Sequence, residues 1–206
     1  MPHKRTIYMK YRTNLVILFL SFFWEFNLVA QNSTINDSLI IGRTVNEFFA
    51  WYINAIKQKS YSEFQPTFVE SSSGMTTLNY TKYVNNLNKF GFSDSLITKE
   101  VSFYKHCVDE LEKVKYSEFN TQFIDLDDFE NIECDFGNYY RWIGGQEPID
   151  GIRILTVKFI NSSSASVNID YYDFNSEDNR NIYWGNNWVT MIRVNNTWKI
   201  NNINWR

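Results

Sequence analysis

The sequence predicts an α+β domain in which N-terminal helices pack on an antiparallel sheet of about four strands. Three observations lead to this prediction. Apolar residues recur at helical spacing in the first half of the chain, β-branched and aromatic residues alternate in its last third, and 44% of the 206 residues are hydrophobic. Helices that precede a run of strands typically cover one face of an antiparallel sheet.

The first thirty residues have the character of a secretory signal peptide. Basic residues cluster within residues 4–12, an apolar run extends from Leu15 to Trp24, and Ala30 stands at the boundary with polar sequence. A basic start, an apolar run of about ten residues and a small boundary residue are typical of a cleaved signal. We therefore expect cleavage near Ala30 and export to the periplasm or the medium.

Two alternatives remain open for this leader. One is a retained N-terminal anchor, although the apolar run is shorter than the ~20 residues of a membrane span. We expect no stable membrane span after signal removal. The other concerns the start: Met9 begins a more compact signal, so either Met1 or Met9 is the first residue. No Cys lies near the boundary, so lipid attachment there has no acceptor.

The predicted mature chain is acidic. Residues 31–206 keep 16 basic and 22 acidic residues. An acidic domain has no electrostatic attraction to phosphate backbones, so we expect no nucleic-acid partner. Residues 31–42 are predicted to be a flexible segment, and residues 43–206 a single α+β domain.

The first helix is predicted from a capping box. Thr44 and Glu47 have the required spacing, and an apolar helical stripe follows to about Lys57. Further helices are predicted over residues 61–69, with Pro66 limiting that helix, over residues 80–90, with Gly91 at its end, and over residues 95–115. A helical turn is expected around residues 127–132.

His106 and Cys107 lie side by side on the helix predicted at residues 95–115. The apolar stripe of that helix includes Ile97, Tyr104 and Leu111 and places His106 on the opposite, solvated face. Adjacent helical residues point about 100° apart, so the two side chains do not form a catalytic dyad.

The predicted mature chain has two cysteines, Cys107 and Cys134, and two interpretations remain open for them. In an oxidising compartment they pair as a disulfide. Otherwise each serves as a small buried hydrophobe. With one histidine after the leader, a zinc site lacks ligands, and we expect no metal and no cofactor.

The last third of the chain is predicted to be a meander of strands over residues 152–160, 165–171, 188–194 and 197–205. Residues 161–164 and Asn195-Asn196 are the predicted turns, and residues 174–181 a loop. Trp198 and Ile200 fall out of phase with Ile203, which predicts a bulge near Asn201.

Three segments resemble the cystatin-like, nuclear-transport-factor-two-like superfamily, and within it a bacterial family of uncharacterised exported or lipoprotein domains. They are FFAWYI (48–53), RWIGGQEPID (141–150) and VNNTWKINNINW (194–205). The resemblance covers about residues 43–206 and implies a curved sheet that wraps a helix into a conical pocket. It implies no established reaction, so no catalytic residue carries over. Lipoprotein members have an acceptor Cys that this chain lacks.

The candidate binding site is an aromatic group near two glycine-rich turns. Aromatic side chains on loops stack against ligands, and neighbouring charged groups orient them. The candidate ligand-binding residues are Tyr140, Arg141, Trp142, Glu147, Asp173 and Trp184. The acidic residues between positions 125 and 135 do not match an EF-hand and are interpreted as a solvated face.

Three functions are compatible with this pattern. The first is an exported, non-catalytic binding domain that recognises a small molecule, a glycan or a protein through the aromatic group or the sheet. The second is a hydrolase or isomerase that uses Asp173 with a tyrosine, or Glu147 with Asp150. The third is an immunity-type protein that binds a toxin. We favour the first and expect no catalytic residue.

Overall fold

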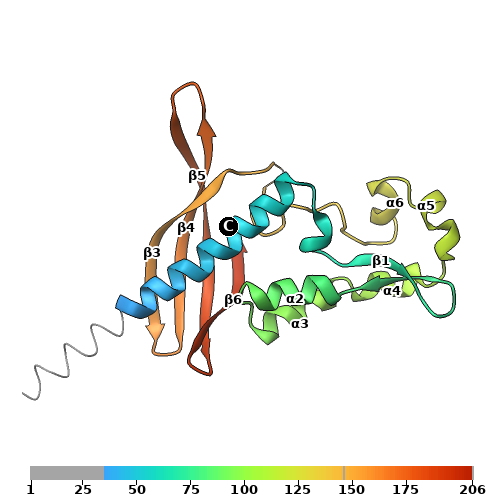
Figure 1. Ribbon diagram of the computed structural model, residues 1–206, viewed down its shortest axis with the longest axis horizontal. Coiled ribbons are helices and arrows are strands. Elements are labelled where there is room, and N and C mark those ends of the chain that lie inside the picture. Colours follow the sequence, from blue (N-terminus) through green and yellow to red (C-terminus); the bar gives the residue numbers. More distant parts are fainter. Residues whose placement is uncertain (1–34, 146, 206) are drawn as a thin grey trace, which may run out of the picture. The chain divides into compact units, whose positions relative to one another are not determined.

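The computed structural model of the chain describes residues 35–145 and 147–205 (Figure 1). The predicted signal peptide, with its cleavage point at Ala30, lies outside the described residues. Residues 35–40 are helical and belong to an N-terminal unit, and residues from 41 onward form a second unit, whose architecture follows. Within the described residues, no helix is long and apolar enough to cross a membrane.

A long helix over residues 41–57 begins this unit. Its buried side chains recur at spacings of three and four: Ile41, Val45, Phe48, Phe49, Tyr52, Ile53 and Ile56. Phe49 packs against Tyr171 of the sheet with ring centroids 6.3 Å apart. The predicted start at Thr44 is wrong, because residues 41–43 are already helical. Ile41 extends the apolar stripe by one turn, and this outweighs the capping signal.

The helix predicted over residues 61–69 is also wrong. A single 3-10 turn, η1 (Tyr61–Glu63), precedes strand β1 (Thr67–Glu70), which pairs antiparallel with β2 (Thr76–Asn79). Pro66 ends any helix before it. The following Thr67-Phe68-Val69 has high strand propensity, and Gly74, at φ 81°, closes the hairpin.

The middle of the chain is helical, as predicted, but in shorter pieces. Helix α2 (Thr81–Lys89) ends before Gly91, whose φ is 80°. Helix α3 (Asp94–Phe103) begins at Ser93, which caps the Leu96 N–H at 3.2 Å. The single helix expected over residues 95–115 is divided at Tyr104, where α4 (Lys105–Leu111) begins. The amide of Tyr104 bonds to the Val101 carbonyl, an i→i+3 contact that tightens the chain there.

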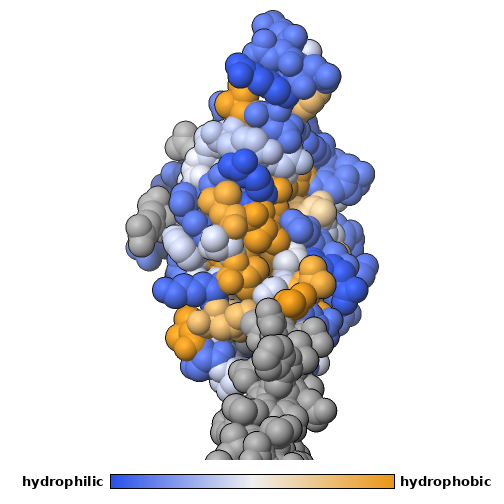
Figure 2. Space-filling model, turned by 90° about the vertical axis from the view of Figure 1, so that its left-hand side faces the viewer, coloured by the Kyte–Doolittle hydropathy of each residue, from blue (hydrophilic) through white to orange (hydrophobic). Residues whose placement is uncertain are grey.

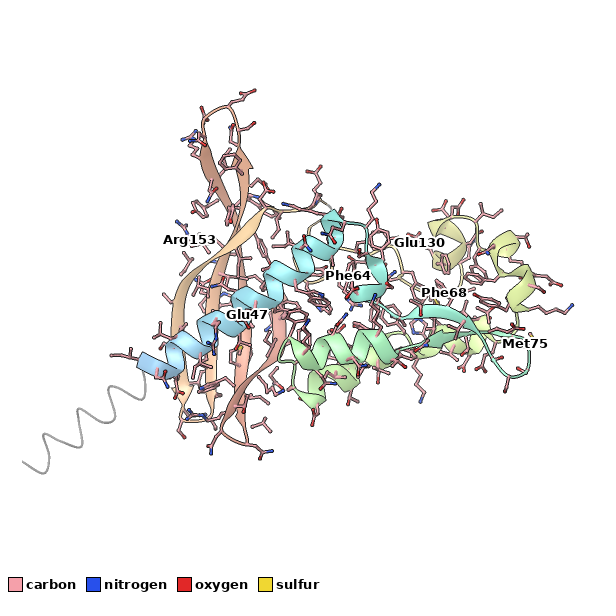
Figure 3. The ribbon with its side chains drawn as sticks, in the orientation of Figure 1. Glu47, Phe64, Phe68, Met75, Glu130 and Arg153 are labelled. Atoms are coloured by element: carbon pink, nitrogen blue, oxygen red, sulfur yellow. A yellow bond between two sulfur atoms is a disulfide. The ribbon has the colours of Figure 1, made fainter. Side chains whose placement is uncertain are left out.

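Short helices η2 (Tyr116–Glu118), α5 (Phe119–Gln122) and α6 (Leu126–Glu130) follow. They surround a satellite cluster of phenylalanines formed by Phe68, Phe119, Phe123, Phe129 and Phe136. Phe68, labelled in Figure 3, supplies the ring from β1. Two of the neighbouring acidic residues form the capping box of α6, with the Asp125 carboxylate accepting from the Asp128 amide.

The sheet is an antiparallel meander of four strands in the order β3-β4-β5-β6. These are β3 (Gly151–Asn161), β4 (Ser164–Asn175), β5 (Arg180–Val194) and β6 (Thr197–Trp205). On β4, Ala165, Val167, Ile169 and Tyr171 are buried and alternate with half-buried residues. The chain is therefore α+β, with helices before a four-stranded antiparallel sheet. The predicted bulge is confirmed, because the β5–β6 register skips Asn201.

The hairpin between β4 and β5 is longer than predicted. Residues 174–181 were expected to be a loop, yet Phe174 pairs with Asn181 and Asn175 with Arg180, so only residues 176–179 turn. Beyond Tyr172, which pairs with Gly151 of β3, β4 pairs only with β5, so the hairpin extends past the sheet (Figure 1). Figure 2 shows its hydrophilic tip above a band of apolar surface on the β3 side of the molecule.

Candidate functional site

A pocket of about 600 Å³ lies beside α3 and the last residues of β6. Three segments line it. Helix α3 contributes Lys99, Glu100, Ser102 and Phe103, and β6 contributes Asn202 and Asn204. The segment before the sheet contributes Asp135, Asn138, Arg141 and Trp142. Its volume lies within the range of about 300–1,000 Å³ that is usual for small-molecule sites.

A buried ion pair forms the floor of the pocket. Nη2 of Arg141 lies 2.8 Å from Oε2 of Glu100, and the two side chains are only 9% and 14% exposed. Tyr83 donates a hydrogen bond to the same carboxylate at 2.7 Å, and Trp142 donates to its other oxygen at 3.3 Å. The negative charge of Glu100 is thus matched by a cation and two neutral donors.

The Arg141 guanidinium is held equally closely on its other sides. Nη1 donates to the Tyr104 hydroxyl at 2.6 Å, and Nη2 also donates to the Phe64 carbonyl and the Tyr83 hydroxyl. Four aromatic rings surround the guanidinium carbon at 4.4–5.7 Å, which is cation–π distance: Tyr83, Phe103, Tyr104 and Trp142. Nε is buried and has no partner within the described residues.

Burial shifts the ionisation of the tyrosines at this floor. It raises the pKa of Tyr104 to about 12, against the opposing effect of the Arg141 cation. Burial also raises the pKa of Tyr83 well above its usual value near 10. For Arg141, burial alone lowers the pKa, but Tyr83, Glu100 and Tyr104 outweigh it and the pKa is raised. At neutral pH the tyrosines are therefore neutral hydrogen-bonding groups and the arginine is a permanent cation.

A disulfide holds the segment that carries Arg141. Cys107 of α4 is bonded to Cys134, with their Cα atoms 5.5 Å apart, and both are buried. His106 is exposed, and its ring nitrogen donates to the Glu133 carbonyl. A ring nitrogen of His106 and the two cysteine sulfurs lie within 4.8 Å of one another. Because the two sulfurs are bonded to each other, they offer no thiolate to a metal ion.

The structure brings two of the six predicted binding residues into this pocket. Arg141 and Trp142 line it. Tyr140 is half-buried and Glu147 is exposed, and neither lines this pocket or the one beside the long helix described below.

Asp173 and Trp184, the other two predicted residues, form a separate pair. They lie at the base of the β4–β5 hairpin, where the indole N–H of Trp184 donates to the Asp173 carboxylate. Trp184 packs against Tyr171, and a methyl group on Gly145 would touch its ring. Asp173 lines neither of the two pockets described here.

Sequence reasoning missed Glu100, although a signal for it exists. Glu100 lies three residues after Ile97 and four before Tyr104, on the apolar face of its helix. A carboxylate at such a position needs a buried partner. Arg141 meets that need, but only the tertiary structure places the two side chains together.

A second pocket, of about 390 Å³, lies between the long helix and the start of β3. Its charged groups are Lys57 and Asp150, which form an ion pair. The hydrogen bond from Lys57, and a further one from the Phe174 amide, lower the pKa of Asp150. Asp150 is therefore a weak base that is already paired with Lys57, which does not suit the catalytic role that the second function hypothesis gives it together with Glu147.

No family model, no curated protein and no solved structure matches this chain.

Proposed function

We propose that this protein is an exported binding domain that holds a small ligand in the pocket between α3 and β6 and catalyses no reaction. We further propose that its α+β arrangement is a cystatin-like, nuclear-transport-factor-two-like fold, as the three resembling segments suggest. The leader supports export, and the acidic charge of the predicted mature chain favours no nucleic-acid partner.

The observation that carries the proposal is that the ionisable groups at the floor of the pocket are already paired with one another or held neutral. A general acid or base needs an ionisable group that is free to exchange a proton with a substrate. Here the carboxylate of Glu100 accepts from Arg141, Tyr83 and Trp142, and burial keeps the Tyr104 hydroxyl protonated. Such a floor shapes and polarises a site without supplying a reactive group.

Filling the pocket tests this function. Asn138 is exposed at the pocket, so Asn138→Trp places a bulky ring there without disturbing the buried ion pair. The wild-type chain, incubated with small molecules extracted from the source cells, is expected to retain a ligand detectable by native mass spectrometry. Asn138→Trp is expected to lose it.

Asn120→Trp is the matched control, since Asn120 is exposed on α5 and lies outside the pocket. Equal retention by all three proteins would show that the ligand binds elsewhere and would end the proposal. Sequencing the N-terminus of the exported protein tests the localisation, with a first residue near Gln31 expected.

A further inference from the structure

We propose that the pocket between α3 and β6 selects neutral, polyhydroxylated ligands, a short oligosaccharide being the class that fits best. This inference rests on the proposed function, because it names the ligand of that same pocket. Three properties carry it: the charges of the floor cancel, the unused polar groups are neutral, and an aromatic ring is exposed at the rim.

The charge balance disfavours ions. Arg141 and Glu100 neutralise each other in a buried pair, so a charged ligand meets no unbalanced charge at the floor. The remaining ionisable side chains of the lining are Lys99 and Asp135, which are exposed and of opposite sign. Moving a charge out of water without a partner is costly. At the floor, a ligand with a net charge therefore loses hydration and meets no unbalanced counter-charge.

The neutral polar groups that remain available are the side-chain amides of Asn138, Asn202 and Asn204 and the hydroxyl of Ser102. The side chain of Asn138 has no hydrogen-bond partner within the described residues, because only its backbone amide is used, by Asp135. The Asn202 side chain donates to the side-chain Oδ1 of Asn204, and within the described residues the Asn202 Oδ1 and the Asn204 side-chain N–H groups have no further partner. A carboxamide both donates and accepts, as a hydroxyl group does, so these residues suit a ligand that carries many hydroxyl groups.

The rim supplies an apolar platform. Phe103 ends α3 with 42% of its surface exposed, although its ring also packs edge-on against Tyr104. Sugar rings present an apolar C–H face that stacks on such aromatic rings, while their hydroxyl groups point outward to hydrogen-bonding partners. Phe103 beside the three asparagines provides both kinds of contact in one cavity.

Calorimetric titration of the full chain with four trisaccharides tests this proposal. The neutral probes are maltotriose and triacetylchitotriose, and the charged probes are trigalacturonate, an anion, and deacetylated chitotriose, a cation at mildly acidic pH. We expect a neutral probe to bind at least about tenfold more tightly than either charged probe.

Phe103→Ala is expected to weaken that binding by about tenfold. Phe174→Ala is the matched control, because Phe174 is similarly exposed, at 49%, on the β4–β5 hairpin and is expected to change nothing. Asn138→Ala gives a second test at an exposed position, where removing the side chain disturbs no core packing. We expect it to weaken binding of the neutral probe about tenfold.

Each other outcome is decisive. If a charged probe binds more tightly than the neutral probes, and Phe103→Ala abolishes that binding, the proposed ligand class is overturned. The binding pocket itself then stands. Neutral binding that is unchanged in both pocket variants would place the sugar elsewhere and overturn the inference. Absence of binding by all four probes would also overturn it, while the proposed function is then judged separately by ligand retention in Asn138→Trp.

Discussion

Glu100 and Arg141 form an ion pair at the floor of the pocket, 2.8 Å apart between α3 and the segment that leads into the sheet. The pair joins α3 to the segment before the sheet. Its hydrogen bonds to Tyr83 and Tyr104 extend the connection to α2 and to the junction of α3 and α4. The same residues therefore shape the pocket and hold the helices in place.

Removing one partner of this pair is expected to destabilise the fold strongly. Glu100→Gln leaves the Arg141 cation buried without a counter-charge, and breaking a buried pair in this way costs about 3–5 kcal/mol. Urea unfolding measures the loss. Glu47→Gln is the control, because Glu47 is exposed and pairs with Arg43 only at 4.0 Å. Equal stability of the two variants would show that the pair contributes nothing to folding.

Alkaline pH is expected to destabilise the protein through its buried tyrosines. The pKa of Tyr104 is about 12 in the folded state, against about 10 in an unfolded chain. The folded state thus binds the phenolic proton more tightly, so this contribution is complete below about pH 10 and is lost as the pH rises toward about 12. Stability against urea, measured across this range, should fall.

Tyr104→Phe should flatten the alkaline fall in stability, and Tyr116→Phe, which removes an exposed hydroxyl, should leave it unchanged. Ultraviolet absorbance of tyrosinate gives an independent readout, since Tyr104 should stay protonated to well above pH 10 in the folded protein. Ionisation of all tyrosines together near pH 10 in the folded protein would contradict this prediction.

The disulfide is expected to stabilise the domain and to restrain the pocket segment. Cys107 and Cys134 are separated by 27 residues, and closing a loop of that length stabilises a fold by about 3–4 kcal/mol in the chain-entropy model. The Cys107→Ala/Cys134→Ala variant should lose about that much in denaturant unfolding. Hydrogen exchange should increase more in residues 134–142 than in β4, whose amides report the global loss of stability. Equal exchange in both proteins would show that the bond does not hold the segment.

The turn between β5 and β6 offers a stabilising substitution. Asn195 and Asn196 have φ values of 48° and 62°, which is the two-residue hairpin turn that requires left-handed backbone at both positions. Asn196→Gly removes the remaining steric cost and should raise stability by about 0.5–1 kcal/mol. Asn196→Val should lower it by about 1–2 kcal/mol. Thermal unfolding of the pair checks both signs, and a lower midpoint for Asn196→Gly would contradict the assignment.

Local signals in the sequence were sufficient for much of the fold. The alternation from Ala165 to Tyr171 predicted the buried face of β4, and Asn195-Asn196 predicted the turn between β5 and β6, because both depend on neighbouring residues alone. The same kind of reasoning failed at residues 61–69. There Pro66 stops the helix early, and residues 67–70 pair with the next strand, β2, in a hairpin that the sequence analysis did not predict.

The candidate site shows the same division more sharply. Composition and spacing made Arg141 and Trp142 candidate binding residues, and both line the pocket, while the pairing of Cys107 with Cys134 was left open. They could not supply Glu100, Tyr83 or Asn204, because side chains from α3, α2 and β6 meet only after the chain has folded. Periodicity is a property of one segment, whereas the neutral floor of the pocket is a property of several segments packed together, and that packing was decided by the tertiary structure.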